Sequence, residues 1–113
     1  MKIAVPTDEK KGLEDTVAEH FGRARNFLIY DTETKISNIY ANPEAAGEAQ
    51  LPPDFLHGQK VDIIIVFNLG PKAYDKFKNY NVKMYKATKG TIQENLEKFK
   101  NTQLEKLKKE NIF

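Results

Sequence analysis

An unbroken apolar run at residues 63–67, Ile-Ile-Ile-Val-Phe, stands near the middle of the chain. A strand with one face in water alternates apolar and polar residues, so a continuous β-branched run predicts a strand covered on both faces. A buried helix is the alternative, but the run is short and stops at Asn68 and Gly70. Pro71 then suits the first position of a helix, where its missing N–H costs nothing. The inward residues of that helix are Ala73, Tyr74 and Phe77.

The first part of the chain predicts three strands with tight connections. Residues 2–5 indicate a first strand that ends at Pro6, and residues 9–19 indicate a charged loop with one helical turn near Asp15. Residues 27–30 and 36–40 are two further strands. The short link between them favours an antiparallel hairpin.

The rest of the chain alternates helices with strands. Residues 42–50 predict a mobile loop, and Pro52-Pro53 opens a short helix that ends near Gly58. A fifth strand is expected at 82–85. The helix at 91–101 has a capping box at its start, with Thr91 and Glu94 bonding each other's backbone. The same pattern at 102–105 predicts a second short helix. The inward residues of the helix at 91–101 are Ile92, Leu96 and Phe99. Those of the second short helix are Leu104 and Leu107.

This order of elements predicts one α/β domain over residues 1–113, with three layers. An antiparallel hairpin is joined to a parallel portion in which strands and helices alternate. Ligands of such open sheets collect at the carboxyl ends of the parallel strands, where helix N-termini offer free N–H groups. The pattern therefore predicts where a site lies, and the chemistry must come from the residues there.

Composition and charge exclude several classes of function. The chain has 113 residues and a formal net charge of +2, from 18 basic and 16 acidic residues, so neither nucleic acid nor a membrane is an expected partner. It lacks cysteine, which excludes disulfides, thiolate nucleophiles and clusters held by the chain's own thiolates. No apolar run is long enough to span a bilayer and no signal peptide is evident. We expect a cytoplasmic protein.

The segment His20-Phe-Gly-Arg-Ala24 carries the sharpest candidates. His20 could bind a metal through one imidazole nitrogen, or it could fix the loop by bonding a backbone carbonyl. Phe21 is expected to anchor the loop in the core, and Gly22 to permit a positive φ angle. Arg23 and Arg25 suit an anionic ligand, or else form surface salt bridges with Asp31 or Glu19.

A second group of candidates follows the central strand. Asn68, Gly70 and Lys72 would place a helix N-terminus and a cation at one anion-binding turn, although Gly70-Pro71 also serves simply as an efficient helix start. The Gly-Lys-Ser/Thr of a P-loop is absent, so nucleotide hydrolysis has no support. His57, after a short helix, is expected to be solvated.

Three pieces of this sequence together resemble the dinitrogenase iron–molybdenum cofactor family. They are Lys2-Ile-Ala-Val-Pro6, His20-Phe-Gly-Arg-Ala24 with Phe27-Leu-Ile-Tyr-Asp31, and the stretch from Val61 to Ala73. The resemblance implies a ribonuclease-H-like α/β/α fold with a mixed five-stranded sheet, order 3-2-1-4-5 and strand 2 antiparallel. It also implies carriage of an iron–sulfur or iron–molybdenum type cofactor. Members often have a histidine-rich segment after the third strand, whereas residues 42–50 contain no histidine.

The favoured hypothesis is a non-catalytic binding or carrier protein like the nitrogenase accessory proteins. It would receive a metallocofactor or small anion at a site formed by His20, Gly22, Arg23, Asn68, Gly70 and Lys72, with His20 as metal ligand. The alternative is a metal-free module that binds a protein partner or senses a small ligand. A metal-dependent nuclease is a third hypothesis, but it needs converging carboxylates, and Asp8, Asp31 and Asp62 are the acids available near strands.

Overall fold

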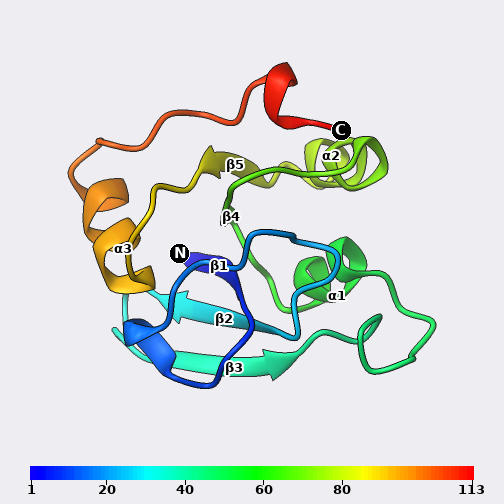
Figure 1. Cartoon of the computed structure of the whole chain (residues 1–113), viewed down its shortest axis with the longest axis horizontal. Coiled ribbons are helices and arrows are strands. Elements are labelled where there is room, and N and C mark those ends of the chain that lie inside the picture. Colours follow the sequence, from blue (N-terminus) through cyan, green and yellow to red (C-terminus); the bar gives the residue numbers. More distant parts are fainter.

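The computed structural model describes all residues, 1–113, as a five-stranded mixed sheet with helices on both faces (Figure 1). Its strands are β1 (Lys2–Thr7), β2 (Asn26–Asp31), β3 (Ser37–Ala41), β4 (Ile63–Val66) and β5 (Lys83–Lys86). The order across the sheet is β3-β2-β1-β4-β5. Strand β2 is antiparallel to β1 and β3, while β4 is parallel to β1 and β5. The predicted strand order and the single antiparallel strand are confirmed.

The helices divide between the two faces of the sheet. Helices α1 (Pro52–Gly58) and α2 (Pro71–Asn79) lie on one side, and α3 (Ile92–Lys100) lies on the other (Figure 1). The short 3-10 helix η1 (Gly12–Glu14) shares the α3 side, and a second one, η2 (Lys109–Asn111), lies near the end of the chain. None of these helices has the length and apolarity that crossing a membrane requires.

Strand β4 divides its side chains between two hydrophobic clusters. Ile64 and Val66 join the cluster under α1 and α2, while Ile63 and Ile65 join the one under α3. All four side chains are at most 4% exposed. The prediction of a central strand covered on both faces is confirmed.

The prediction that Pro6 ends the first strand is wrong. Strand β1 continues to Thr7, and Pro6 lies opposite Phe27 of β2. Backbone groups of the even residues of β1 face β4, since the carbonyl of Lys2 accepts from Asp62 N at 2.9 Å. The pairing of β1 with β4 ends before Pro6, so the missing N–H breaks no bond of the ladder.

Each α-helix is followed, two positions after its last residue, by a residue in the left-handed backbone conformation. Lys60, Asn81 and Thr102 have φ angles of 64°, 60° and 56°. In each case the next N–H bonds back to a carbonyl in the last turn, which is a Schellman motif. The pairs are Val61 N with Leu56 O, Val82 N with Phe77 O, and Gln103 N with Lys98 O, at 3.2, 2.9 and 2.7 Å.

The predicted second helix after α3 does not form. Thr102 does not cap a new helix, because it is the left-handed residue that closes α3, and its hydroxyl donates to the carbonyl of Asn101 at 2.6 Å. The following residues instead run across the β5 edge of the sheet to a point beside α2 (Figure 1). We call residues 104–113 the strap.

The strap bonds to the sheet at two places. The N–H of Lys86 in β5 donates to Glu105 O at 2.8 Å, and the N–H of Leu107 donates to Met84 O at 3.0 Å. Further on, Ile112 lies in a parallel bridge with Leu69, just after β4. Leu104 joins the cluster under α3, and Leu107 joins the cluster under α1 and α2. The strap therefore wraps the β5 edge and contributes to both layers of core.

Candidate functional site

The loop containing His20 and the turn after β4 lie against each other. Strands β1 and β4 are parallel neighbours, so the segments that follow them leave the same end of the sheet. The side-chain amide of Asn68 donates to the carbonyl of Glu19 at 3.3 Å. This hydrogen bond joins the His20 loop (residues 19–24) to the β4–α2 turn (residues 67–70).

His20 is exposed, and its imidazole forms no hydrogen bond within the chain. The next residue, Phe21, anchors the loop as expected, since its side chain is only 5% exposed. The Phe21 ring centre lies 5.1 Å from that of Phe27 and 5.5 Å from that of Phe77. The loop is therefore fixed by Phe21, and both nitrogens of the His20 imidazole are free.

The buried side-chain amide of Asn42 fixes the His20 loop by hydrogen bonds to its backbone. Its side chain is 0% exposed and donates to the carbonyls of Gly22 at 3.3 Å and Ala24 at 2.8 Å. Its side-chain oxygen accepts from the N–H of Glu44 at 3.0 Å. The sequence placed Asn42 only at the start of a loop. The Asn-Pro dipeptide there, which favours the start of a turn, was the available signal.

The expected positive φ angle at Gly22 is wrong. The glycines with positive φ are Gly12, Gly47 and Gly90. A Cβ atom built on Gly22 would meet no heavy atom within 4 Å. Neither backbone conformation nor crowding inside the chain therefore calls for glycine at this position.

A cavity of about 450 Å³ lies between the His20 loop and the N-terminal ends of α1 and α2. Gly22 lines it on one side and Lys72 on the other, together with Lys76, Glu44 and Asp75. Its two basic and two acidic side chains balance. Lys72 forms no ion pair, so it is available to a ligand.

Lys76 is engaged in a cluster that ties α1 to α2. Its ammonium lies 2.7 Å from a carboxylate oxygen of Asp54, and the other oxygen accepts from the hydroxyl of Tyr80 at 2.5 Å. These hydrogen bonds, from Lys76 and then Tyr80, lower the pKa of Asp54. The same bond to Asp54 raises the pKa of Lys76. His57 is exposed, as expected, and stacks on Tyr80 with ring centres 3.8 Å apart.

The remaining candidates differ in their surroundings. Arg23 and Arg25 are exposed and form no ion pair, so the alternative of salt bridges with Asp31 or Glu19 is not realised. Gly70 precedes α2 as its N-cap, and Pro71 takes the first helical position as predicted. The strap reaches this turn, because Leu69 N donates to Asn111 O at 3.0 Å.

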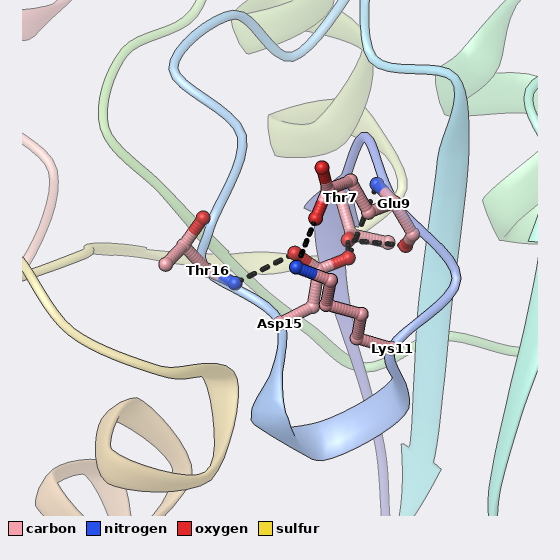
Figure 2. A network of polar contacts seen from close by, with 5 residues as sticks. All are labelled: Thr7, Glu9, Lys11, Asp15 and Thr16. Atoms are coloured by element: carbon pink, nitrogen blue, oxygen red, sulfur yellow. Dashed lines mark hydrogen bonds and ion pairs between the residues drawn. The ribbon is translucent and has the colours of Figure 1, made fainter.

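A second polar group organises the neighbouring loop after β1 (Figure 2). The carboxylate of Asp15 is 4% exposed and accepts from the hydroxyl of Thr7. It also accepts from the N–H of Glu9 at 3.1 Å and of Thr16 at 2.8 Å. The carbonyl of Asp15 accepts from the N–H of Ile92 at 2.8 Å, which attaches the loop to α3. The buried carboxylate of Asp15 is thus satisfied by three hydrogen-bond donors, without an ion pair.

The acidic residues near strands do not converge. Asp8 follows β1 and accepts from Arg25 N at 3.2 Å, whereas Asp62 accepts from Lys2 N at 2.8 Å, at the other end of β1. Asp31 accepts from Glu33 N at 2.9 Å, a hydrogen bond that lowers its pKa. No group of three or more His, Cys, Asp or Glu side chains is close enough to hold a metal ion. The nuclease hypothesis finds no support in this arrangement.

The other face of the sheet carries a larger cavity, of about 560 Å³. It lies along α3 and is lined mainly by apolar side chains, among them Ile3, Leu13, Tyr30, Leu96 and Phe99. The candidate residues from the sequence are all absent from its lining.

Comparison with known proteins relates this chain to small proteins of several microorganisms. A protein of Methanocaldococcus jannaschii, named only as uncharacterised, is 33% identical over 112 residues, which cover 94% of this chain and 91% of the relative. A Thermotoga protein with the provisional name NifB, solved by NMR, is 32% identical with a TM-score of 0.81, covering 94% of this chain and 92% of that one.

The apo form of the orange protein from Desulfovibrio gigas has a TM-score of 0.82 over 94% of this chain and 92% of its own. At 22% identity it shows a shared fold only. The family model described as dinitrogenase iron-molybdenum cofactor matches residues 1–102. The chain therefore belongs to the dinitrogenase iron–molybdenum cofactor family.

Proposed function

We propose that this protein is a non-catalytic carrier of an anionic metallocofactor of the iron–sulfur or iron–molybdenum type, or of a small anion. The cargo binds where the His20 loop meets the β4–α2 turn. The observation that carries the proposal is the hydrogen bond from Asn68 to Glu19 O, which brings the two segments together. Membership of the family supports the class of cargo.

The donors of the chain fit a cargo that brings most of its own ligands. The chain has no cysteine, and its His, Asp and Glu side chains form no group that could hold a metal by itself. His20 can contribute one imidazole nitrogen, because neither of its nitrogens is used within the chain. A cluster bound here therefore keeps non-protein ligands or shares ligands with a partner protein.

Two cations without ion-pair partners, and open space at Gly22, also support an anionic cargo. Arg23 and Lys72 have no ion-pair partner, and the N-terminus of α2 adds the partial positive charge of its free N–H groups. At Gly22 the absent side chain leaves room for a ligand to approach the backbone. This gives glycine a reason that the fold alone does not provide.

The first test removes each of the two histidines in turn. Wild type, His20→Ala and His57→Ala are titrated anaerobically with isolated iron–molybdenum cofactor and, separately, with ferrous iron and sulfide. Metal content and absorption spectra measure binding, and melting curves measure stability. We expect His20→Ala to weaken binding at least about tenfold, equivalent to about 1.4 kcal/mol, with an unchanged melting temperature. His57→Ala is the matched control and should bind like wild type.

The second test fills the space at Gly22. The Gly22→Ala variant adds one methyl group that meets no atom of the chain, so its stability should match wild type while its binding weakens. Gly58→Ala is the control, since a Cβ there is equally free of contacts and lies at the end of α1. Equal affinity of Gly22→Ala and wild type would contradict this placement of the cargo.

A metal-free module that binds a small ligand is the second candidate, favoured by the apolar cavity along α3. Protein that takes up neither metal nor cofactor in the titrations would support it over the carrier. Thermal shifts with a panel of small apolar ligands then test it directly. A Leu96→Lys change, at a half-buried residue lining that cavity, should abolish any shift.

A further inference from the structure

The two edges of the sheet differ in their backbone hydrogen bonds. At the β5 edge the strap supplies partners, through Lys86 N to Glu105 O and Leu107 N to Met84 O. At the opposite edge β3 pairs only with β2, and no further bridge or hydrogen bond engages its outer side. The edges lie at opposite ends of the strand order, with β3 far from the strap (Figure 1).

The free backbone groups of β3 belong to alternate residues. Asp31 N donates to Ile36 O at 3.0 Å and Asn42 N donates to Arg25 O at 2.9 Å, so the backbone of even-numbered residues faces β2. Since the direction alternates along a strand, the N–H and C=O groups of Ser37, Ile39 and Ala41 point outward.

Strand β3 itself carries neither of the residue types that normally prevent edge pairing, and the 3-10 helix η1 that contacts it packs on its α3 face and leaves its outer edge unpaired. Natural edge strands are protected by charged side chains, proline or covering segments. Residues 36–41, Ile-Ser-Asn-Ile-Tyr-Ala, include no charge and no proline, and Ile36 is 57% exposed. The nearest charged residues outside the strand are Lys35 and Glu44, which have opposite signs.

We propose that β3 pairs antiparallel with β3 of a second copy of this chain, about a two-fold axis at Ile39. In this register Ser37 lies opposite Ala41 of the second copy, and Ile39 lies opposite its own counterpart. Each such pair exchanges two bonds, so about six hydrogen bonds engage every free group of both edges. The antiparallel direction also brings the Lys35 end of one copy beside the Glu44 end of the other.

A second copy is favoured over an unrelated strand because the same residues satisfy both sides of a two-fold interface. The dimer keeps two separate sites. Strand β3 runs parallel to β1, so its carboxyl end lies at the end of the sheet that carries the His20 loop. Antiparallel pairing reverses the second copy, which places the two His20 loops at opposite ends of the joint sheet.

The first experiment compares two double variants in sedimentation equilibrium. Ser37→Lys with Ala41→Lys places like charges opposite each other at both ends of the interface, whereas Ser37→Lys with Ala41→Glu places opposite charges there. We expect wild type to form a reversible dimer. At low salt the dimer of the first variant should dissociate at least about tenfold more readily than that of the second, and salt should reduce the difference.

Melting curves of the two double variants control for folding, because Ser37 and Ala41 are four residues apart and do not oppose each other within one chain. Equal dimer affinity of the two folded variants would overturn the proposal. Wild-type protein that remains monomeric up to about 1 mM would also overturn it. The same holds if the β3 edge of the monomer binds an unrelated extended peptide but no second copy.

Amide hydrogen exchange gives a second, residue-specific readout. The N–H groups of Ser37, Ile39 and Ala41 should gain protection as the concentration of wild-type protein rises. The N–H groups of Asn38 and Tyr40 face β2 and should keep the same protection at every concentration. A concentration-dependent dimer without protection at the three odd residues would show that another surface pairs, and would exclude this one.

Discussion

The two ends of the sheet are closed in different ways. At the end that carries the His20 loop, buried polar side chains hold the connections. Asn42 holds residues 22–24, Asp15 holds the loop after β1, and Asn95 holds the loop before α3. At the other end the chain turns on left-handed residues such as Lys60 and Asn81, whose side chains are exposed.

The difference shows two ways to fix a connection: by hydrogen bonds from a buried side chain, or by the backbone conformation of one residue. Asn95 is 0% exposed and bonds the N–H of Thr88 at 2.8 Å and the carbonyls of Thr88 and Thr91, both at 3.0 Å. A buried amide of this kind fixes one loop shape, because any other shape leaves polar groups unpaired. A Schellman motif needs only a positive φ angle. The end that carries the His20 loop, which we call the specified end, is therefore the one where the exact loop shape matters.

The largest effect is expected at Asn42. An Asn42→Ala change leaves the carbonyls of Gly22 and Ala24 without their donor inside the protein, at a cost of about 2–3 kcal/mol of unfolding free energy. Urea denaturation measures the loss, and amide chemical shifts should change in residues 20–24. Asn79→Ala, at an exposed position of α2, is the control and should change little. Equal stability of Asn42→Ala and wild type would remove Asn42 as the support of the loop.

A cap at the specified end should come next. Thr91 accepts from the N–H of Glu94 at 3.1 Å, and Glu94 accepts from the N–H of Thr91 at 3.0 Å, so the predicted capping box is confirmed. Thr91→Ala should lower the unfolding free energy by about 0.5–2 kcal/mol through loss of the cap. A Thr91→Ser variant keeps the hydroxyl and should retain most of the stability. If serine and alanine were equally costly, the hydroxyl would not be the reason.

Another threonine, at the opposite end of the same helix, should respond with the opposite sign. Thr102 is a β-branched residue held at φ 56°. Glycine avoids a strain of about 1–2 kcal/mol in this conformation and loses about 0.5–1 kcal/mol to chain entropy, so Thr102→Gly should stabilise by roughly 0.5–1 kcal/mol. Thermal and urea denaturation measure it. A destabilised Thr102→Gly would mean that its side chain, and not backbone geometry, closes α3.

The smallest effect concerns pH. Hydrogen bonds from Thr91, first from its N–H and then from its hydroxyl, lower the pKa of Glu94 below its ordinary value of 4.5. A lowered pKa in the folded state stabilises the protein above the unfolded value, and this stability is lost as the pH falls through the folded value. Glu94→Gln should therefore flatten the fall of stability below about pH 4.5. Lys60→Gly, at a cap made by backbone alone, should leave the shape of the pH profile unchanged.

The sequence predicted those parts of the fold that depend on burial and on local capping. Ile63 to Val66 are buried on both faces, and Thr91 caps α3, because each signal lies within a few neighbouring residues. The pattern at Thr102 looks the same locally, but the strap bonds of Glu105 and Leu107 to β5 favour an extended chain. The prediction that Pro6 ends the first strand is wrong for a similar reason, since only the neighbouring strands show that its missing N–H is not needed.

For the candidate site, the sequence predicted neighbouring segments but not their supports. The parallel pairing of β1 and β4 brings the His20 loop to Asn68, as the strand order implied. The roles of Asn42 and Asp15 depend on carbonyl and N–H groups that come close only in the folded chain. The prediction of a positive φ angle at Gly22 is wrong, and its place in the site stays a prediction. Whether these residues bind a cargo stays a prediction.

The strap has a consequence for how the domain comes apart. Its Leu104 is packed in one hydrophobic layer and its Leu107 in the other, with the β5 edge between them. Loss of either hydrophobic layer frees the strap, which also contributes a leucine to the layer on the other face of the sheet. Melting of one layer thus weakens the other, which favours a single all-or-none transition over a partly unfolded intermediate with one intact face.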